Sequence, residues 1–192
     1  MNGFDKQAAE QAIDALRLAR ANGELAARWF ALWQDDALPP RARFRPVNFK
    51  RFLPNIALFS VVPDRRVTVR LAGTRFAHVL GQDVTGMDWI AAAPEQYRPR
   101  RLAVLSQIAR GAILIDNRRF ATTDGEDYVS EEILLPFAPD ANGVVPVLAH
   151  ADLPVDRFVK VKSLIQVFGE PEDVRVVTLR RVEETPEVAK VA

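Results

Sequence analysis

The sequence predicts an α+β fold: a five-stranded antiparallel sheet with crossover helices on one face, preceded by N-terminal helices. In residues 66–71, Val67, Val69 and Leu71 alternate with polar residues, the period of a half-buried strand. After this strand, Phe76, Val79 and Leu80 recur at the spacing of a helix, which predicts a short helix that ends at Gly81. Two strands therefore precede the helices and three follow, an order that one sheet with its helices on one face accommodates.

Length and composition indicate one main domain with terminal additions. The chain has 192 residues, 48% of them hydrophobic and 27% charged, with a net charge of +1. Arginine outnumbers lysine 21 to 5, a bias typical of paired, partly buried cations and no indication of nucleic acid by itself. We expect a helical segment at 1–35, the main domain at 36–152, and an extension at 153–192 with one further strand and a frayed tail.

The chain has no cysteine, which excludes disulfides, Cys-ligated zinc and flavin chemistry through a cysteinyl adduct. No apolar run approaches the ~18 residues of a membrane span, and the N-terminus lacks a secretory h-region. We therefore expect a cytoplasmic protein without a membrane span.

The first two elements are predicted helices, residues 5–21 and 24–34, separated by a break at Asn22-Gly23. Their apolar stripes favour packing on the chain's own domain. The functional alternative is a dimerisation surface, and we expect the protein to be a homodimer through these helices. The candidate interface residues are Ile13, Leu16, Leu25 and Trp29.

A basic segment follows the helices, with five cations and no acid: Arg41, Arg43, Arg45, Lys50 and Arg51. It is interpreted either as a solvated loop or as a patch for nucleic acid or another acidic partner. The interleaved Phe44, Phe49 and Phe52 favour the first interpretation, because they resemble anchors to a core more than a stacking platform.

The remaining strands are predicted from apolar runs between turn signals. Residues 56–62 form a hairpin with 66–71, and a long helix spans 94–110. Three strands follow at 112–122, 128–137 and 144–150, with a turn at Asp124-Gly125; Pro146 favours an edge or bulge in the last strand. Residues 156–168 mix both periods, 173–182 indicate one more strand, and 183–192 are polar.

Four motifs in this order resemble those of a PAS domain, and more narrowly of a largely uncharacterised bacterial single-PAS group. They are Leu32-Trp33 with Leu38-Pro39-x-Arg41 and Pro46; Phe52-Leu53-Pro54-Asn55-Ile56; Arg70-Leu71-Ala72-Gly73-Thr74 with Gly81 and Thr85-Gly86; and Leu134-Leu135-Pro136-Phe137 with Gly143. The resemblance covers about residues 24–152. It implies a sensory or interaction module, commonly without catalysis, that signals through a partner protein or an oligomeric change. It implies no universal cofactor, because PAS domains bind haem, flavin, small metabolites or nothing.

The sequence contains few residues that could bind a cofactor or a metal or act in catalysis. His78 and His150 are the two residues that could ligate haem, and a lone histidine is more often structural, so haem is disfavoured and no metal site is expected. No nucleophile motif or phosphate loop is present, and we predict no catalytic residues. Glu131 and Glu132 are neighbours on a strand, face opposite ways, and cannot act as one acid/base pair.

The predicted function is therefore a non-catalytic PAS-type sensory or protein-interaction module, with a small ligand between sheet and helices. Binding of nucleic acid or an acidic partner through the basic segment is the alternative. Candidate residues for the ligand pocket are large apolar side chains, which would equally suit a filled core. They are Phe76, Val84, Trp89, Leu102, Leu105, Ile113, Ile115 and Leu134.

Overall fold

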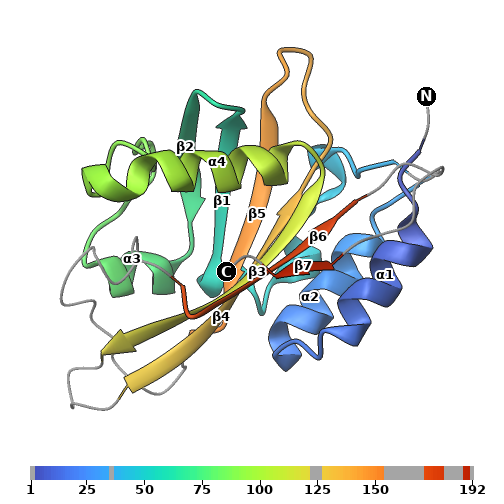
Figure 1. Ribbon diagram of the computed structural model, residues 1–192, viewed down its shortest axis with the longest axis horizontal. Coiled ribbons are helices and arrows are strands. Elements are labelled where there is room, and N and C mark those ends of the chain that lie inside the picture. The colour runs from blue at the N-terminus through green and yellow to red at the C-terminus, as the bar shows by residue number, and fades with distance from the viewer. Residues whose placement is uncertain (1–2, 35–36, 122–126, 154–170, 180–187, 191–192) are drawn as a thin grey trace.

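A computed structural model describes residues 3–34, 37–121, 127–153, 171–179 and 188–190 (Figure 1). The helices are α1 (Lys6–Ala15), α2 (Arg20–Phe30), α3 (Thr74–Leu80) and α4 (Arg98–Ala109), with short 3-10 turns η1 (Arg41–Arg43), η2 (Pro46–Phe49), η3 (Leu53–Asn55) and η4 (Glu95–Tyr97). The strands are β1 (Ile56–Val62), β2 (Arg66–Ala72), β3 (Ala112–Ala121), β4 (Asp127–Pro136), β5 (Val145–Ala151), β6 (Asp173–Thr178) and β7 (Val188–Lys190).

The strands form one antiparallel sheet in the order β2-β1-β5-β4-β3-β6-β7, seven strands within the described residues. The predicted five-stranded sheet is its first five members, and β6 is the further strand expected near residue 173. Residues 188–190, expected in a frayed tail, pair with β6 instead. Pro146 lies in β5, an internal strand between β1 and β4, and pairs with Ser60 in a continuous register, so the expectation of an edge or a bulge was wrong. The turn at 124–125 and residues 156–168 lie outside the described residues.

The crossover helices α3 and α4 lie on one face of the sheet, as predicted, and the N-terminal helices α1 and α2 cover the other face (Figure 1). On the face we call the cavity face, α3 and α4 pack over alternate strand residues such as Phe59, Leu114 and Leu134. On the opposite face, here the N-terminal face, α1 and α2 pack over their neighbours, such as Ile113 and Leu135. The N-terminal helices are thus part of the domain's own core.

The break between the first two helices lies at residues 16–19, not at Asn22-Gly23 as predicted. Arg17 adopts a left-handed conformation with φ of 50°, whereas Asn22 and Gly23 continue inside α2. Asn22 is a poor helix former, but its side chain is fully buried and hydrogen-bonded to the sheet. A tertiary contact therefore overrides the local break signal.

Two of the sequence motifs meet where β2 ends. Gly73 donates its backbone N–H to the carbonyl of Ile56, at 2.7 Å. A Cβ on Gly73 would lie 2.2 Å from the Leu53 carbonyl oxygen and 2.4 Å from that of Pro54. Only glycine fits between β2, α3 and η3, and this contact fixes the start of α3 over the sheet.

Candidate functional site

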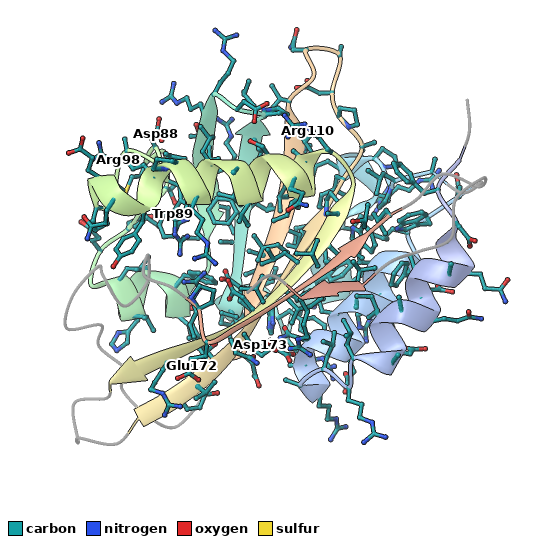
Figure 2. All side chains as sticks on the ribbon, in the orientation of Figure 1. Asp88, Trp89, Arg98, Arg110, Glu172 and Asp173 are labelled. Carbon is teal, nitrogen blue, oxygen red and sulfur yellow. The ribbon has the colours of Figure 1, made fainter. Side chains whose placement is uncertain are left out.

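A cavity of about 140 Å³ lies between the cavity face of the sheet and helices α3 and α4. Its apolar walls come from strand residues such as Phe59, Leu114 and Leu134 and from α4 through Val104 and Leu105. Trp89 closes one side beneath the start of α4 (Figure 2). Both ends of α4 are fastened: Arg98 donates to the Ala93 carbonyl at 2.8 Å, and Arg110 pairs with Asp64 (Figure 2).

Of the predicted pocket residues, Phe76, Trp89, Leu105 and Leu134 line this cavity. Val84 and Leu102 pack in the same apolar cluster without lining it. Ile113 and Ile115 belong to the N-terminal face, so the structure corrects both assignments. Side chains alternate along a strand, and Leu114 and Asp116 take the places on β3 that these two isoleucines were predicted to occupy.

The floor of the cavity carries a charged cluster that the sequence reasoning missed. Asp116 and Arg118 of β3 stand opposite Glu132 and Ser130 of β4, and Arg101 reaches the same space from α4. Asp116 is 3% exposed, and its Oδ2 accepts from Arg118 Nη2 at 2.5 Å. Arg118 Nε lies 3.7 Å from Glu132 Oε2, whereas Asp116 Oδ1 has no hydrogen-bond partner among the described residues.

Burial perturbs the ionisation of this cluster. Desolvation, and then the charge of Asp116, raise the pKa of Glu132 to about 7, against the opposing effect of the two arginines. Desolvation and the nearby Arg118 lower the pKa of Arg101 to about 10, although Glu132 and Asp116 act in the other direction. Glu132 can therefore change its charge near neutral pH, and Arg101 stays cationic there.

The sequence contains a pattern from which part of this charged cluster could have been predicted. Asp116 and Arg118 are two residues apart inside a strand that begins with four apolar residues, so they must share a face. Polar side chains on the inner face of a predicted strand are unusual and favour a site. What the sequence could not give is which face points to α4.

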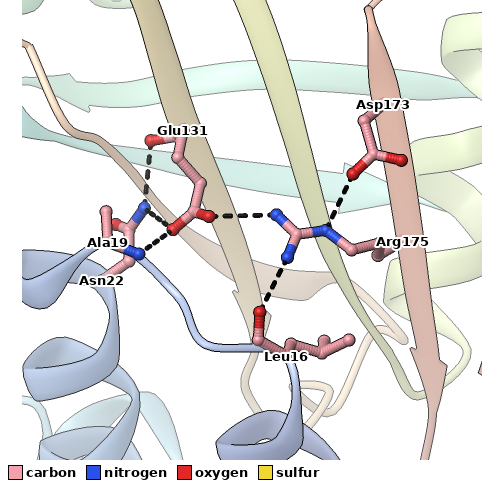
Figure 3. A network of polar contacts seen from close by, with 6 residues as sticks. All are labelled: Leu16, Ala19, Asn22, Glu131, Asp173 and Arg175. Atoms are coloured by element: carbon pink, nitrogen blue, oxygen red, sulfur yellow. Dashed lines mark hydrogen bonds and ion pairs between the residues drawn. The ribbon is translucent and has the colours of Figure 1, made fainter.

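A second polar network lies on the N-terminal face (Figure 3). The Glu131 carboxylate accepts from the Ala19 N–H at 2.8 Å, from Asn22 Nδ2 at 3.0 Å and from Arg175 Nη2 at 3.0 Å. Arg175 also donates to the Leu16 carbonyl and pairs with Asp173. The network fastens the α1–α2 connection to β4 and β6.

The two histidines do not line the cavity. His150 is 2% exposed and lies on the N-terminal face, with its Nδ1 2.6 Å from Asn22 Oδ1, an atom that can only accept. Burial lowers the pKa of His150 to about 4, so the ring is neutral at pH 7. His78 is exposed on α3. Within the described residues no group of three His, Cys, Asp or Glu could hold a metal ion, and no helix could cross a membrane.

Three cations of the basic segment have partners inside the chain. Arg41 donates to the Phe44 carbonyl and lies 4.8 Å from that residue's ring centroid; Arg43 donates to the Leu32 carbonyl at 2.9 Å. Arg51 pairs with Glu24 and stacks on Phe52. Arg45 and Lys50 are exposed. Phe44, Phe49 and Phe52 are buried anchors, as the first interpretation predicted.

The candidate dimer residues are occupied within the chain. Ile13, Leu25 and Trp29 are buried in the core of the N-terminal face, and Leu16 packs against it. The apolar surface of Ile13, Leu25 and Trp29 is already used by the fold, which corrects their assignment to an interface between two copies. Leu16 is only partly buried.

The chain is similar to one family of known proteins and, more distantly, to solved structures. A family model described as a PAS domain matches residues 18–149, well over half of the chain. An RNA-binding light-oxygen-voltage receptor is 19% identical over 62% of this chain and 35% of its own, with a TM-score of 0.37. The PAS domain of an HTR-like protein from Haloarcula marismortui is 19% identical over 55% of this chain and 88% of its own, with a TM-score of 0.32. No curated protein matches.

The class that the fold defines is an α+β domain built on an antiparallel sheet, and the family model assigns it to a family of sensory or interaction modules. The chain belongs to the PAS domain family.

Proposed function

We propose that this protein is a non-catalytic PAS-type sensor that binds a small molecule in the cavity between α3, α4 and the sheet. The charged cluster of Asp116, Arg118, Glu132 and Arg101 at the floor of that cavity carries the proposal. Burying such groups costs free energy that apolar residues of similar size would avoid. Perturbed ionisable groups beside a cavity are typical of functional sites.

The orphan acceptor supports the same proposal. Asp116 Oδ1 is buried and lacks a donor among the described residues. An unmatched buried acceptor costs about 1–3 kcal/mol. A ligand or an ordered water that donates to this oxygen would remove that cost, so the site favours an occupant with polar atoms at one end.

Strand β4 offers a route from the cavity to the N-terminal helices. Glu132 lies on the cavity face, while its neighbour Glu131 holds the α1–α2 connection on the opposite face. A ligand that moved β4 would therefore act on both networks. We propose that the signal leaves through a partner protein or a second copy of the chain, with cytoplasmic location as part of the same proposal.

The test fills the cavity without touching its charges. Val104 lines the cavity on α4, and its neighbour Ala103 is exposed on the same helix. Native mass spectrometry of freshly purified protein, followed by thermal unfolding with a library of small metabolites, should show bound mass or a raised midpoint for wild type and Ala103→Trp. Val104→Trp should show neither. Equal responses of the two variants, or no response from wild type, would contradict ligand binding in this cavity.

A further inference from the structure

We infer that the ligand is a small apolar molecule with a hydrogen-bond donor, a hydroxyl or an amine N–H, and that this donor binds the Asp116 carboxylate at the floor of the cavity. This inference rests on the proposed function, since it names the chemistry of the molecule that the cavity takes. It follows from the unmatched oxygen of Asp116, from the residues around that side chain, and from the size and walls of the cavity.

Asp116 has one carboxylate oxygen without a donor. The residue lines the cavity and is 3% exposed. Its Oδ2 accepts from Arg118 Nη2 at 2.5 Å, whereas Oδ1 is buried and has no hydrogen-bond partner among the described residues. An ionised carboxylate can only accept hydrogen bonds, so this oxygen favours a neighbour that donates.

The neighbours of Asp116 in the sheet do not supply that donor. Asp116 lies opposite Val174 of β6, whose side chain has no polar atom, and opposite Glu132 of β4, which has no proton to donate when it is ionised. On the same face of β3, Leu114 is apolar and Arg118 already binds the other oxygen. The cavity lies over this position, so we expect its occupant to supply the missing donor.

Ser130 adds a second acceptor to the same floor. It lines the cavity, is 1% exposed and lies opposite Arg118 in the pairing of β3 with β4. Its hydroxyl donates to the Asp152 carbonyl at 3.3 Å. A serine hydroxyl has one proton, so while it makes this bond it can only accept from a ligand. Two acceptors on one floor therefore favour an occupant that donates.

The volume and walls of the cavity define the apolar body of the ligand. The cavity measures about 140 Å³, and an engineered apolar cavity of about 150 Å³ in another protein binds benzene. Apolar side chains from the sheet and α4 line it, among them Phe59, Leu105, Leu134 and Val176. A single ring or a short branched chain therefore fits, with its donor at the floor.

The test compares three one-ring probes of nearly the same size: phenol, aniline and toluene. Phenol and aniline donate from oxygen and nitrogen, whereas the methyl group of toluene donates nothing. Isothermal titration calorimetry is carried out at pH 8, where Glu132, with its pKa of about 7, is mostly ionised. At least one of the two donors should bind at least about tenfold more tightly than toluene, a difference of about 1.4 kcal/mol, because toluene leaves the polar groups of the floor unpaired.

Asp116→Asn tests which acceptor the ligand uses. Arg118 can only donate, so the amide oxygen should stay with Arg118 and the amide nitrogen should take the place of Oδ1. The variant should lower the affinity for the preferred donor at least about tenfold. It should keep the affinity for toluene, which shows that the cavity is intact. The control is Asp64→Asn, at an exposed turn outside the cavity, which should change neither affinity.

The outcomes separate this inference from the proposed function. If Asp116→Asn does not fold, the three probes on wild type still decide. Toluene binding as tightly as both donors in wild type overturns the choice of a donor and leaves ligand binding in place. An unchanged preference for the donor in Asp116→Asn overturns Asp116 as the acceptor.

Failure of all three probes to bind has two distinct meanings. If Ala103→Trp still responds to a metabolite and Val104→Trp does not, the failure overturns this inference alone. If the two tryptophan variants respond equally, it overturns both this inference and the proposed function.

Discussion

Glu131 and Glu132 are neighbours on β4, and they show what distinguishes the two faces of the sheet. Glu131 receives hydrogen bonds from three donors at 2.8–3.0 Å, shared between both oxygens (Figure 3). Glu132 lies 3.7 Å from Arg118 and has a pKa raised to about 7. A carboxylate with its donors in place fastens elements together. A carboxylate such as Glu132, which has a longer contact and lies beside a cavity, can still change its charge.

The largest effect should come from Glu131→Gln. Three donors converge on two carboxylate oxygens, and an amide replaces one oxygen with a further donor. The side chains of Glu131 and Arg175 are only 12% and 14% exposed, so Arg175 would lose its buried partner. We expect a loss of about 3–5 kcal/mol of unfolding free energy in urea denaturation at pH 7.5.

The matched control is Glu172→Gln. Glu172 pairs with Arg119 at 2.5 Å, but both side chains are more than 40% exposed. Surface pairs contribute about 0–1 kcal/mol, so this variant should unfold near wild type. Suppose that Glu131→Gln lost no more unfolding free energy than Glu172→Gln. The network on the N-terminal face would then not be what holds α1 and α2 to the sheet.

A second effect on the same face concerns His150. Its folded pKa of about 4 lies below the ordinary value of 6.5, because burial disfavours the charged ring. Below pH 6.5 the unfolded chain binds a proton that the folded chain does not, so stability falls as pH falls from 6.5 to about 4. The full difference is about 3 kcal/mol at pH 4.

Variants separate this effect from other titrations. His150→Gln should start from a lower stability at pH 7.5 but lose less of it on acidification than wild type does. His78→Gln, at an exposed position on α3, should keep the wild-type pH dependence. Identical pH slopes in both variants, measured by urea denaturation from pH 7.5 to 4, would remove His150 as the cause.

The fold was largely predictable because its signals are local. Alternation in residues 66–71, the left-handed Gly81 and the turn after β1 each act over a few residues, and the structure has these elements within a residue or two of the prediction. The order of strands and helices then limited the topology. Residues 188–190 escaped prediction because a three-residue edge strand is specified by its neighbour β6, not by its own sequence.

The site was only partly predictable because it depends on distant pairings. Four apolar residues begin β3, and nothing local decides which of them face α4, so Ile113 and Ile115 were assigned to the wrong face. Asn22 indicated a helix break, and its real partner, Glu131, is 109 residues further along the chain. The charges at the floor of the cavity converge from β3, β4 and α4, which the sequence separates.

The smallest change in unfolding free energy should come from Glu132→Gln on the cavity face, and it should be a gain and not a loss. The folded pKa of Glu132 is raised to about 7, above its ordinary 4.5. The folded chain therefore holds a proton that the unfolded chain releases between pH 4.5 and 7, and wild-type stability falls as pH rises through that window. Glutamine is neutral at every pH, and its oxygen can still accept from Arg118.

The unfolding free energy of Glu132→Gln should consequently be about 1–2 kcal/mol higher than that of wild type at pH 8. At pH 4.5 the two proteins should have almost the same unfolding free energy. Urea denaturation at both pH values, beside Glu131→Gln, tests the comparison directly, since the same substitution at adjacent positions should move stability in opposite directions. Destabilisation at pH 8 by both substitutions would mean that Glu132 is a structural ion pair like Glu131. The charge of Glu132 would then not destabilise the fold, and a ligand in the cavity could gain no free energy by relieving it.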